Sequence, residues 1–163
     1  MTRRMTGGLC ALALLGAAWP AQAAQAAQVC AWIVESADKE GLHQFDLYLQ
    51  ADGEADVYYM MKGQGVTTEN SRTYSPGKGT YVLHRGRTAK VWGFGTNVDA
   101  GADIDIVAEI HEYPKDIFDE KEPPLLGAAT LRRHVPDDET TVPKAGPAAR
   151  QCFTAPPPRP PGG

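Results

Sequence analysis

The amino-acid sequence predicts an all-β protein, an immunoglobulin-like antiparallel β-sandwich of about seven strands followed by a C-terminal extension. Three observations support this class. Between residues 29 and 113, apolar and polar residues alternate in short segments, and clusters of Gly, Asn, Asp and Pro separate these segments. No window shows the apolar stripe of an amphipathic helix. The 163 residues fit one domain, since domains commonly span about 100–200 residues.

Residues 1–26 predict a secretory signal peptide that is removed on export. The segment starts with Arg3 and Arg4, continues with an apolar run from Leu9 to Leu15, and ends in A-x-A cleavage patterns. The run is shorter than the roughly 20 residues that span a bilayer. We therefore expect a periplasmic or extracellular protein without membrane insertion. Removal of the two arginines leaves 14 basic and 20 acidic residues, a net charge of −6 (14 − 20), which argues against nucleic-acid binding.

The strand pattern is clearest in two of the segments. In 43–51, Phe45, Leu47 and Leu49 are expected to face the core, because side chains of a strand alternate between its two faces. The segment 103–113 alternates in the same way, and its inward residues are Ile104, Ile106, Ala108 and Ile110. The remaining expected strands are 29–36, 54–65, 65–74, 80–84 and 88–96.

The residues between and within these segments predict how the strands connect. Asp52-Gly53 is a typical two-residue hairpin sequence and predicts that the second and third strands pair. The segment 65–74 is polar and rich in threonine, which is typical of an edge strand. Gly93 and Gly95 weaken the strand 88–96 and indicate a bulge or a point of close packing.

The composition changes after Tyr113. A charged loop begins the extension, 114–152, and the segment 125–135 predicts one more strand, which Gly127 can interrupt. A linker rich in Pro, Asp and Thr follows. The last residues, 153–163, are rich in proline and predict a disordered tail with polyproline II character.

The two cysteines that remain after export predict one structural disulfide. Cys10 leaves with the signal peptide, so Cys30 and Cys152 are the pair, and they lie 122 positions apart. A redox-active pair is the alternative, but such pairs usually lie close in sequence. The bridge would fasten the first strand to the C-terminal segment of the chain.

The sequence contains no common catalytic motif, such as G-x-S-x-G, H-E-x-x-H or C-x-x-C, and we expect neither enzymatic activity nor a cofactor. No metal site is expected either. The histidines lack the short spacing of metal ligands and are expected at the surface: His43, His84, His111 and His134. The best calcium candidates are acidic residues that strand alternation largely assigns to a solvent-facing surface: Asp99, Asp103, Asp105 and Glu109.

The segment 54–65 raises a question about its outward face. Tyr58, Met60 and Lys62 fall on one face of this strand, and a tyrosine and a methionine are unusual in a face that meets only water. Two interpretations stay open. The segment after Tyr113 covers this face, with its leucines packed on it: Leu125, Leu126 and Leu131. Alternatively, the face is a binding surface for an extended chain, which can also add as a strand at the sheet edge.

The strand Cys30-Ala31-Trp32-Ile33-Val34 follows the predicted signal peptide almost at once. Paired strands follow in FDLYLQADGEADVYYMMKGQG, then a polar strand in TTENSRTYSPGKG, then YVL and VWGF. In this order of segments, the region from Cys30 to Tyr113 resembles the CsgH and CsgC family of periplasmic accessory proteins in curli assembly. The C-x-C pair of some family members is C-A-W here, so a redox role for that pair is not implied, and the extension lies outside the family pattern.

The resemblance implies an immunoglobulin-like sandwich, residues 27–113, that keeps amyloid-forming curli subunits from assembling in the periplasm. On this reading the protein is a monomeric, non-enzymatic chaperone whose partner is an extended, amyloid-forming subunit. The expected contact residues are Tyr58, Met60 and Lys62, with Thr68, Asn70 and Arg72 on the neighbouring edge. The alternative is another exported binding module, such as a hydrolase inhibitor or an envelope assembly partner, and less readily a metal-binding protein or an enzyme.

Overall fold

The structure is a computed structural model, and it describes residues 25–37, 42–62, 65–67, 72–73, 76–116, 121–139 and 149–158. Within these ranges it contains ten strands and no helix. The strands are β1 (Ala27–Ala37), β2 (His43–Ala51), β3 (Ala55–Met61), β4 (Gly65–Thr67), β5 (Arg72–Thr73), β6 (Lys78–Leu83), β7 (Thr88–Thr96), β8 (Asp103–Glu112), β9 (Leu125–His134) and β10 (Gln151–Ala155). Most of the predicted signal peptide and the end of the tail lie outside the described residues.

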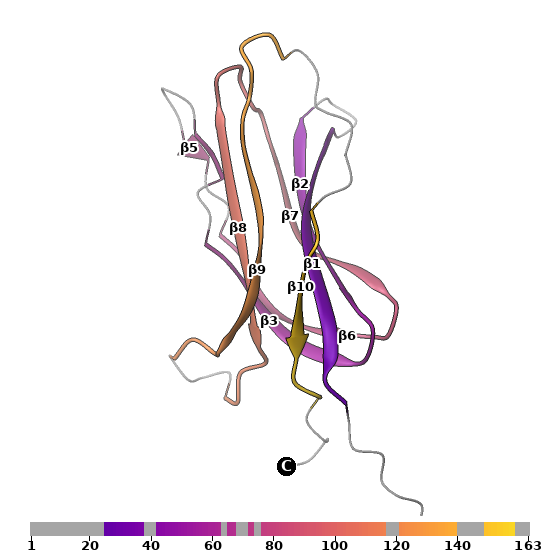
Figure 1. Ribbon diagram of the computed structural model, residues 1–163. Coiled ribbons are helices and arrows are strands. Elements are labelled where there is room, and N and C mark those ends of the chain that lie inside the picture. Colours follow the sequence, from indigo (N-terminus) through magenta and orange to yellow (C-terminus); the bar gives the residue numbers. More distant parts are fainter. Residues whose placement is uncertain are drawn as a thin grey trace, which may run out of the picture.

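Two antiparallel sheets face each other and confirm the predicted all-β sandwich (Figure 1). One sheet has the strand order β10-β1-β2-β7. In the other, β9 lies on one side of the central strand β8, while β3 and β4 share the opposite side of β8. Beyond them, β6 pairs with β3, and β5 pairs with β4. The region after Tyr113 therefore contributes one strand to each sheet, and the finer immunoglobulin-like connectivity stays a prediction. The prediction of a disordered tail from residue 153 is wrong for Phe153, Thr154 and Ala155, because they pair with β1 as part of β10.

The core lies between the two sheets and uses the alternation seen in the sequence. Phe45, Leu47 and Leu49 of β2 are fully buried, as predicted. The predicted inward residues of β8 are buried too: Ile104, Ile106, Ala108 and Ile110. Each large aliphatic side chain removed from water in this way stabilises the fold by roughly 1.5–3 kcal/mol.

The predicted hairpin at Asp52-Gly53 is wrong, because the chain crosses there from one sheet to the other. The partners of β2 are β1 and β7, and those of β3 are β6 and β8. Asp52 holds the crossing against the start of β1: its Oδ1 accepts a 2.8 Å hydrogen bond from the backbone N–H of Gln28, and its own N–H donates to the Gln28 carbonyl. A tight turn therefore forms where predicted, but it does not make the flanking strands neighbours.

The segment 65–74, predicted as one edge strand, instead contains two short strands. In these strands β4 and β5 pair with each other, and Val66 lies opposite Thr73. The prediction for β7 is confirmed, because its pairing with β2 contains a register shift, and a Cβ at Gly93 would stand 2.3 Å from Asp46 Oδ1. The strand β9 continues through Gly127, but its register against β8 shifts there, between the pair Ile110–Gly127 and the pair His111–Leu125.

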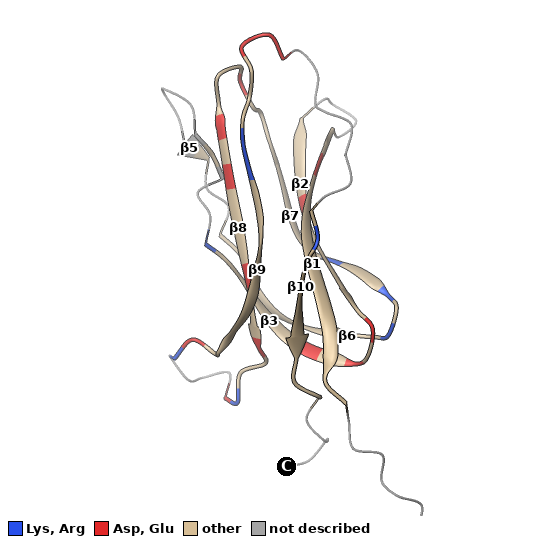
Figure 2. Ribbon diagram, viewed as in Figure 1, with Lys and Arg blue, Asp and Glu red and all other residues tan. Residues whose placement is uncertain are grey.

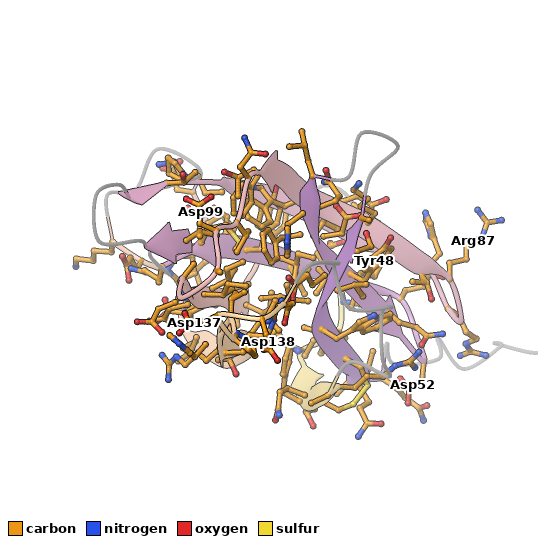
Figure 3. All side chains as sticks on the ribbon, turned by 90° about the horizontal axis from the view of Figure 1, so that it is seen from above. Tyr48, Asp52, Arg87, Asp99, Asp137 and Asp138 are labelled. Atoms are coloured by element: carbon orange, nitrogen blue, oxygen red, sulfur yellow. A yellow bond between two sulfur atoms is a disulfide. The ribbon has the colours of Figure 1, made fainter. Side chains whose placement is uncertain are left out.

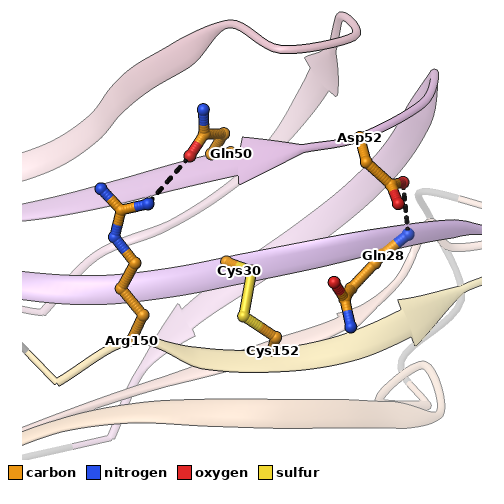
Figure 4. The surroundings of a disulfide bond; sticks show 6 residues. All are labelled: Gln28, Cys30, Gln50, Asp52, Arg150 and Cys152. Carbon is orange, nitrogen blue, oxygen red and sulfur yellow. Dashed lines mark hydrogen bonds between the residues drawn. A yellow bond between two sulfur atoms is a disulfide. The ribbon is translucent and has the colours of Figure 1, made fainter.

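The predicted disulfide between Cys30 and Cys152 is present and joins β1 to β10 (Figure 4). The two residues lie directly opposite each other in the strand pairing, with their Cα atoms 4.0 Å apart. Just before β10, Arg150 packs over the Trp32 ring at 4.2 Å and donates a hydrogen bond to Gln50 Oε1. The bridge is therefore part of a packed strand pair, and it is compatible with an exported protein.

Gly127 of β9 lies against the ring of Phe153 of β10, so these two strands of different sheets pack closely together. A Cβ at Gly127 would stand 2.5 Å from Phe153 Cδ1, so the ring of Phe153 occupies the space that a larger residue would need.

The part of the chain that the structure describes has no helix long and apolar enough to cross a membrane.

Candidate functional site

The outward face of β3 carries the residues singled out in the sequence. Tyr58 lies opposite Thr80 of β6 on one side and His111 of β8 on the other. Met60 lies opposite Lys78 and Glu109 in the same way. Both Tyr58 and Met60 are half-buried, and residues of the β8–β9 connection line the same hollow and cover part of this face.

The connection between β8 and β9 provides this cover. Lys62, at the end of β3, forms an ion pair with Glu122 at 2.7 Å and lies 3.8 Å from Glu109. The backbone N–H of Glu112 donates to the carbonyl of Pro124. These contacts bring the second half of the connection back over the sheet.

A buried histidine forms the second attachment of this connection. His111 is 3% exposed, and its Nδ1 donates a 2.8 Å hydrogen bond to the carbonyl of Pro123. Its Nε2 lies 3.2 Å from Glu109 Oε2, and the Tyr58 ring meets the imidazole edge to face at 6.0 Å. Because a carbonyl oxygen only accepts hydrogen bonds, the proton on Nδ1 is fixed by this geometry.

Between the sheet and the connection there is an open hollow of about 600 Å³. Its floor comes from β3 and β6, and its walls come from the ends of the β8–β9 connection. The residues that line it are Tyr58, Met60, Lys78, Gly79, Thr80, Pro114, Asp116, Lys121, Glu122 and Pro123. A smaller hollow of about 290 Å³ adjoins it on the side of the same connection.

The lining combines a rigid floor with adaptable apolar contacts. Tyr58 offers an aromatic surface and a hydroxyl group, and Met60 offers a flexible thioether that fits irregular shapes. Lys78 brings a positive charge to one side. At the end of the hollow, the hydrogen bond to Glu122 raises the pKa of Lys62, and Lys62 lowers the pKa of Glu122.

Of the two interpretations of the outward face, cover by the segment after Tyr113 is confirmed in part, and a binding surface stays a prediction. The segment after Tyr113 does cover the face, but its prolines and charged residues do so, and the three leucines do not. Leu131 lies opposite Ile106 and packs against the core, while Leu125 is 57% exposed. The connection covers Tyr58 and Met60 only in part and leaves the hollow above them.

The predicted contact residues separate into two groups. Tyr58 and Met60 line the hollow, and Lys62 lies in the ion pair at its end. Thr68 and Asn70 lie outside the described residues, and Arg72 is described only as a strand residue of β5 opposite Thr67. Sequence reasoning missed the other lining residues, and the prolines at both ends of the charged loop were the available signal: Pro114, Pro123 and Pro124.

The most buried charged groups lie elsewhere, between the sheets. Arg133 of β9 donates two hydrogen bonds to Glu35 of β1, at 2.8 and 2.7 Å, and two to Glu139, at 3.0 and 2.9 Å. His43 Nδ1 lies 2.6 Å from Glu35 Oε1. Burial raises the pKa of Glu35, but hydrogen bonds from Arg133 and His43 outweigh this effect and leave it below 4.5. The carboxylate oxygens face cations or donors, and the cluster joins the two sheets.

The expectation that all four histidines lie at the surface is wrong for two of them. His43 and His111 are buried, because a carboxylate or a carbonyl lies within hydrogen-bond distance of each ring. His84 and His134 are exposed and lie 2.8 Å from Glu54 and Asp103.

Three of the four acidic residues weighed for calcium, Asp103, Asp105 and Glu109, lie within ion-pair distance of nearby cationic or histidine side chains. Asp105 receives a 2.7 Å hydrogen bond from Arg132, and Asp103 lies beside His134. Among the described residues, no group of three or more His, Cys, Asp or Glu side chains has the arrangement of a metal site.

Comparisons with known proteins give no match to a family model, to a curated protein or to a solved structure.

Proposed function

We propose that this protein is an exported, non-enzymatic binding protein that holds an extended, aggregation-prone chain and delays its assembly into fibres. The observation that supports this proposal is the open hollow over β3 and β6, in which Tyr58 and Met60 remain available to a partner. The sequence resemblance to the CsgH and CsgC family favours a client of the curli subunit type and a periplasmic location.

The proposed mechanism needs only transient capture. An amyloid fibre grows when extended segments stack in register, so a protein that occupies such a segment lowers the concentration available for nucleation. The disulfide-linked sandwich supplies a surface that is already in its binding shape, which reduces the entropy lost on binding. Methionine and tyrosine suit a client that presents varying side chains.

The experiment adds the mature protein at substoichiometric ratio to a curli-type subunit and follows fibre growth by dye fluorescence. A longer lag phase is expected with the wild-type protein. The double variant Tyr58→Ser/Met60→Ser should shorten that lag while its urea unfolding stays cooperative. Tyr48→Ser is the matched control, because Tyr48 is a half-buried tyrosine on the outward face of the other sheet, where it stacks on Trp32. An unchanged lag with wild-type protein would remove the proposal.

A further inference from the structure

The outer edge of β6 has no strand partner among the described residues. β6 pairs with β3 alone, and it ends the strand order of its sheet on that side. A strand edge of this kind presents unpaired N–H and C=O groups, to which an extended chain can bind as an additional strand.

The hydrogen-bond pattern shows which backbone groups face outward. The N–H of Met61 donates to the carbonyl of Gly77 at 2.8 Å, directly ahead of the pairing of Met60 with Lys78. In an antiparallel pair, residues that bond to the partner alternate with residues that do not. The backbone groups of Gly79 and Tyr81 therefore face β3, and those of Lys78, Thr80 and Val82 face the free edge.

Most of the β6 edge is accessible and lacks the features that block strand pairing; Lys78, at its start, is the exception. Val82 is 53% exposed and Tyr81 is 38% exposed, and β6 contains neither a proline nor a register shift. The opposite edges differ: β7 has a register shift in its pairing and two glycines, and β9 and β10 pack together where Phe153 meets Gly127. Strand edges are commonly blocked by such bulges or by covering elements.

Basic side chains lie at both ends of this edge, and the carboxylate of Glu54 lies against one of these ends, 2.8 Å from His84 Nδ1. Lys78 begins β6, and Arg85 and Arg87 follow it in the turn to β7; Figure 2 shows this turn in blue. Within the described ranges, no ion pair involves the side chain of Lys78 or Arg87. Figure 3 shows Arg87 projecting away from the acidic end of the sandwich, which is marked by Asp99, Asp137 and Asp138.

This charge distribution argues against a second copy of the chain as the occupant. If two β6 strands paired antiparallel, residues whose backbone groups face the free edge would lie opposite one another. In the registers with the longest overlap, Lys78 would then lie opposite Val82 or His84 of the other copy. Either register brings the basic end of one copy close to the lysine of the other. A segment with acidic residues at its ends meets complementary charge instead.

We propose that the edge of β6 binds an extended, acidic segment of the partner chain as an added strand, through the backbone of Lys78, Thr80 and Val82. This inference rests on the proposed function and specifies the chemistry of the client. The segment has β-branched or small residues at its centre and carboxylates near its ends. Its outward side chains lie beside the hollow that contains Tyr58, so the edge and the hollow form one continuous surface.

A fluorescent peptide, Glu-Glu-Val-Thr-Val-Thr-Val-Glu-Glu, is the probe, and a peptide with Lys in place of every Glu is its control. Fluorescence anisotropy should give tighter binding of the Glu peptide by about tenfold at low salt, a preference that weakens with added NaCl. Equal binding of the two peptides would overturn the acidic chemistry. Amide exchange measured by NMR should show protection at Lys78, Thr80 and Val82 only when the Glu peptide is present. No protection there, or protection without peptide that grows with protein concentration, would overturn the assignment.

Substitution by proline tests the strand edge itself. Thr80→Pro removes an N–H that faces solvent and leaves every hydrogen bond to β3, which is where edge strands tolerate proline. The affinity for the peptide should fall about fivefold to tenfold, as expected when one hydrogen bond is lost and an adjacent one is weakened. Thr80→Ala keeps the backbone N–H and should bind the peptide within about twofold of wild type. A folded Thr80→Pro protein with wild-type affinity would overturn the proposal. If this variant does not fold, the exchange experiment on wild-type protein decides.

The fibre assay distinguishes a failure of the proposed function from a failure of the β6 edge assignment. If wild-type protein leaves the lag phase unchanged, the proposed function fails, whatever the peptide does. If wild-type protein extends the lag and folded Thr80→Pro extends it equally, the function stands and the edge assignment fails.

Discussion

Replacing Arg133 by methionine tests whether the buried charge cluster links the sheets. In the wild-type protein the Arg133 side chain is 22% exposed and contacts both Glu35 and Glu139, whereas the Glu35 side chain is only 8% exposed. Methionine keeps most of the length of arginine but removes the charge and the four hydrogen bonds. Glu35 then remains nearly buried, and His43 stays within hydrogen-bond distance of its carboxylate.

The expected loss of unfolding free energy at pH 7 is about 2–4 kcal/mol. Removing one partner of a buried ion pair typically costs about 3–5 kcal/mol, and the partial exposure of Arg133 places it toward the lower end of this range. Arg132→Met is the matched control, since Arg132 is the adjacent residue but its side chain is 65% exposed beside Asp105. Its loss should cost no more than about 0.5–1 kcal/mol.

The dependence of this cost on pH provides a second check. In the wild-type protein the pKa of Glu35 lies below its usual value, so the carboxylate contributes stability above about pH 4.5 that is lost as the pH falls through the lowered pKa. Without Arg133, burial dominates and raises the pKa of Glu35. Charged Glu35 then destabilises the variant at neutral pH, and acidification relieves this effect. The difference between wild type and Arg133→Met should therefore shrink from pH 7 to pH 4.

Urea denaturation monitored by circular dichroism measures these differences for both variants at both pH values. The reasoning is refuted if Arg133→Met costs no more than Arg132→Met, or if its cost is the same at pH 7 and pH 4. The double variant Glu35→Leu/Arg133→Met should recover part of the loss, because it removes the uncompensated charge as well.

Three further predictions concern the disulfide, the packing of Gly127 against Phe153, and the turn at Gly86. Reducing the disulfide, or replacing Cys30 and Cys152 by serine, should lower the unfolding free energy by up to about 5 kcal/mol on the chain-entropy estimate, and equal urea midpoints with and without reductant would contradict this. Gly127→Val should lower the unfolding free energy by about 1–3 kcal/mol, because the valine overlaps the ring of Phe153. In a Phe153→Ala background the same valine should cost less, which thermal melts of wild type, both single variants and the double variant would show. Gly86→Ala should cost about 1–2 kcal/mol, because φ is +70° there while the space around it is empty; an unchanged melting temperature would mean that the turn relaxes.

The alternation of side chains was enough to predict the strands but not their neighbours. Phe45, Leu47 and Leu49 are buried as predicted, because one face of a strand must pack on the core whichever strands lie beside it. The turn at Asp52-Gly53 shows the limit of this information. A tight turn can connect two paired strands or two sheets, and what decides here is the contact of Asp52 with Gln28, 24 residues earlier.

The candidate site was predictable only in its central residues. Tyr58 and Met60 are apolar side chains on an outward face, and the sequence alone marks them as unusual. The shape of the hollow depends on Glu122, which bonds to Lys62 from 60 positions away, and on Pro123, which accepts a hydrogen bond from His111. Such distant polar contacts leave no periodic pattern in a single sequence, so neither the walls of the hollow nor the burial of His111 could be read from it.

The position of β1 has a consequence for how the chain matures. Its native neighbours are β2, which follows within a few residues, and β10, whose Cys152 is 122 positions further on. Because β10 lies near the end of the sequence, nearly the whole chain must be synthesised before β1 has a neighbouring strand on each side. Until β10 is in place, the sheet that contains β1 is incomplete, and formation of the Cys30–Cys152 disulfide fastens the last strand of that layer.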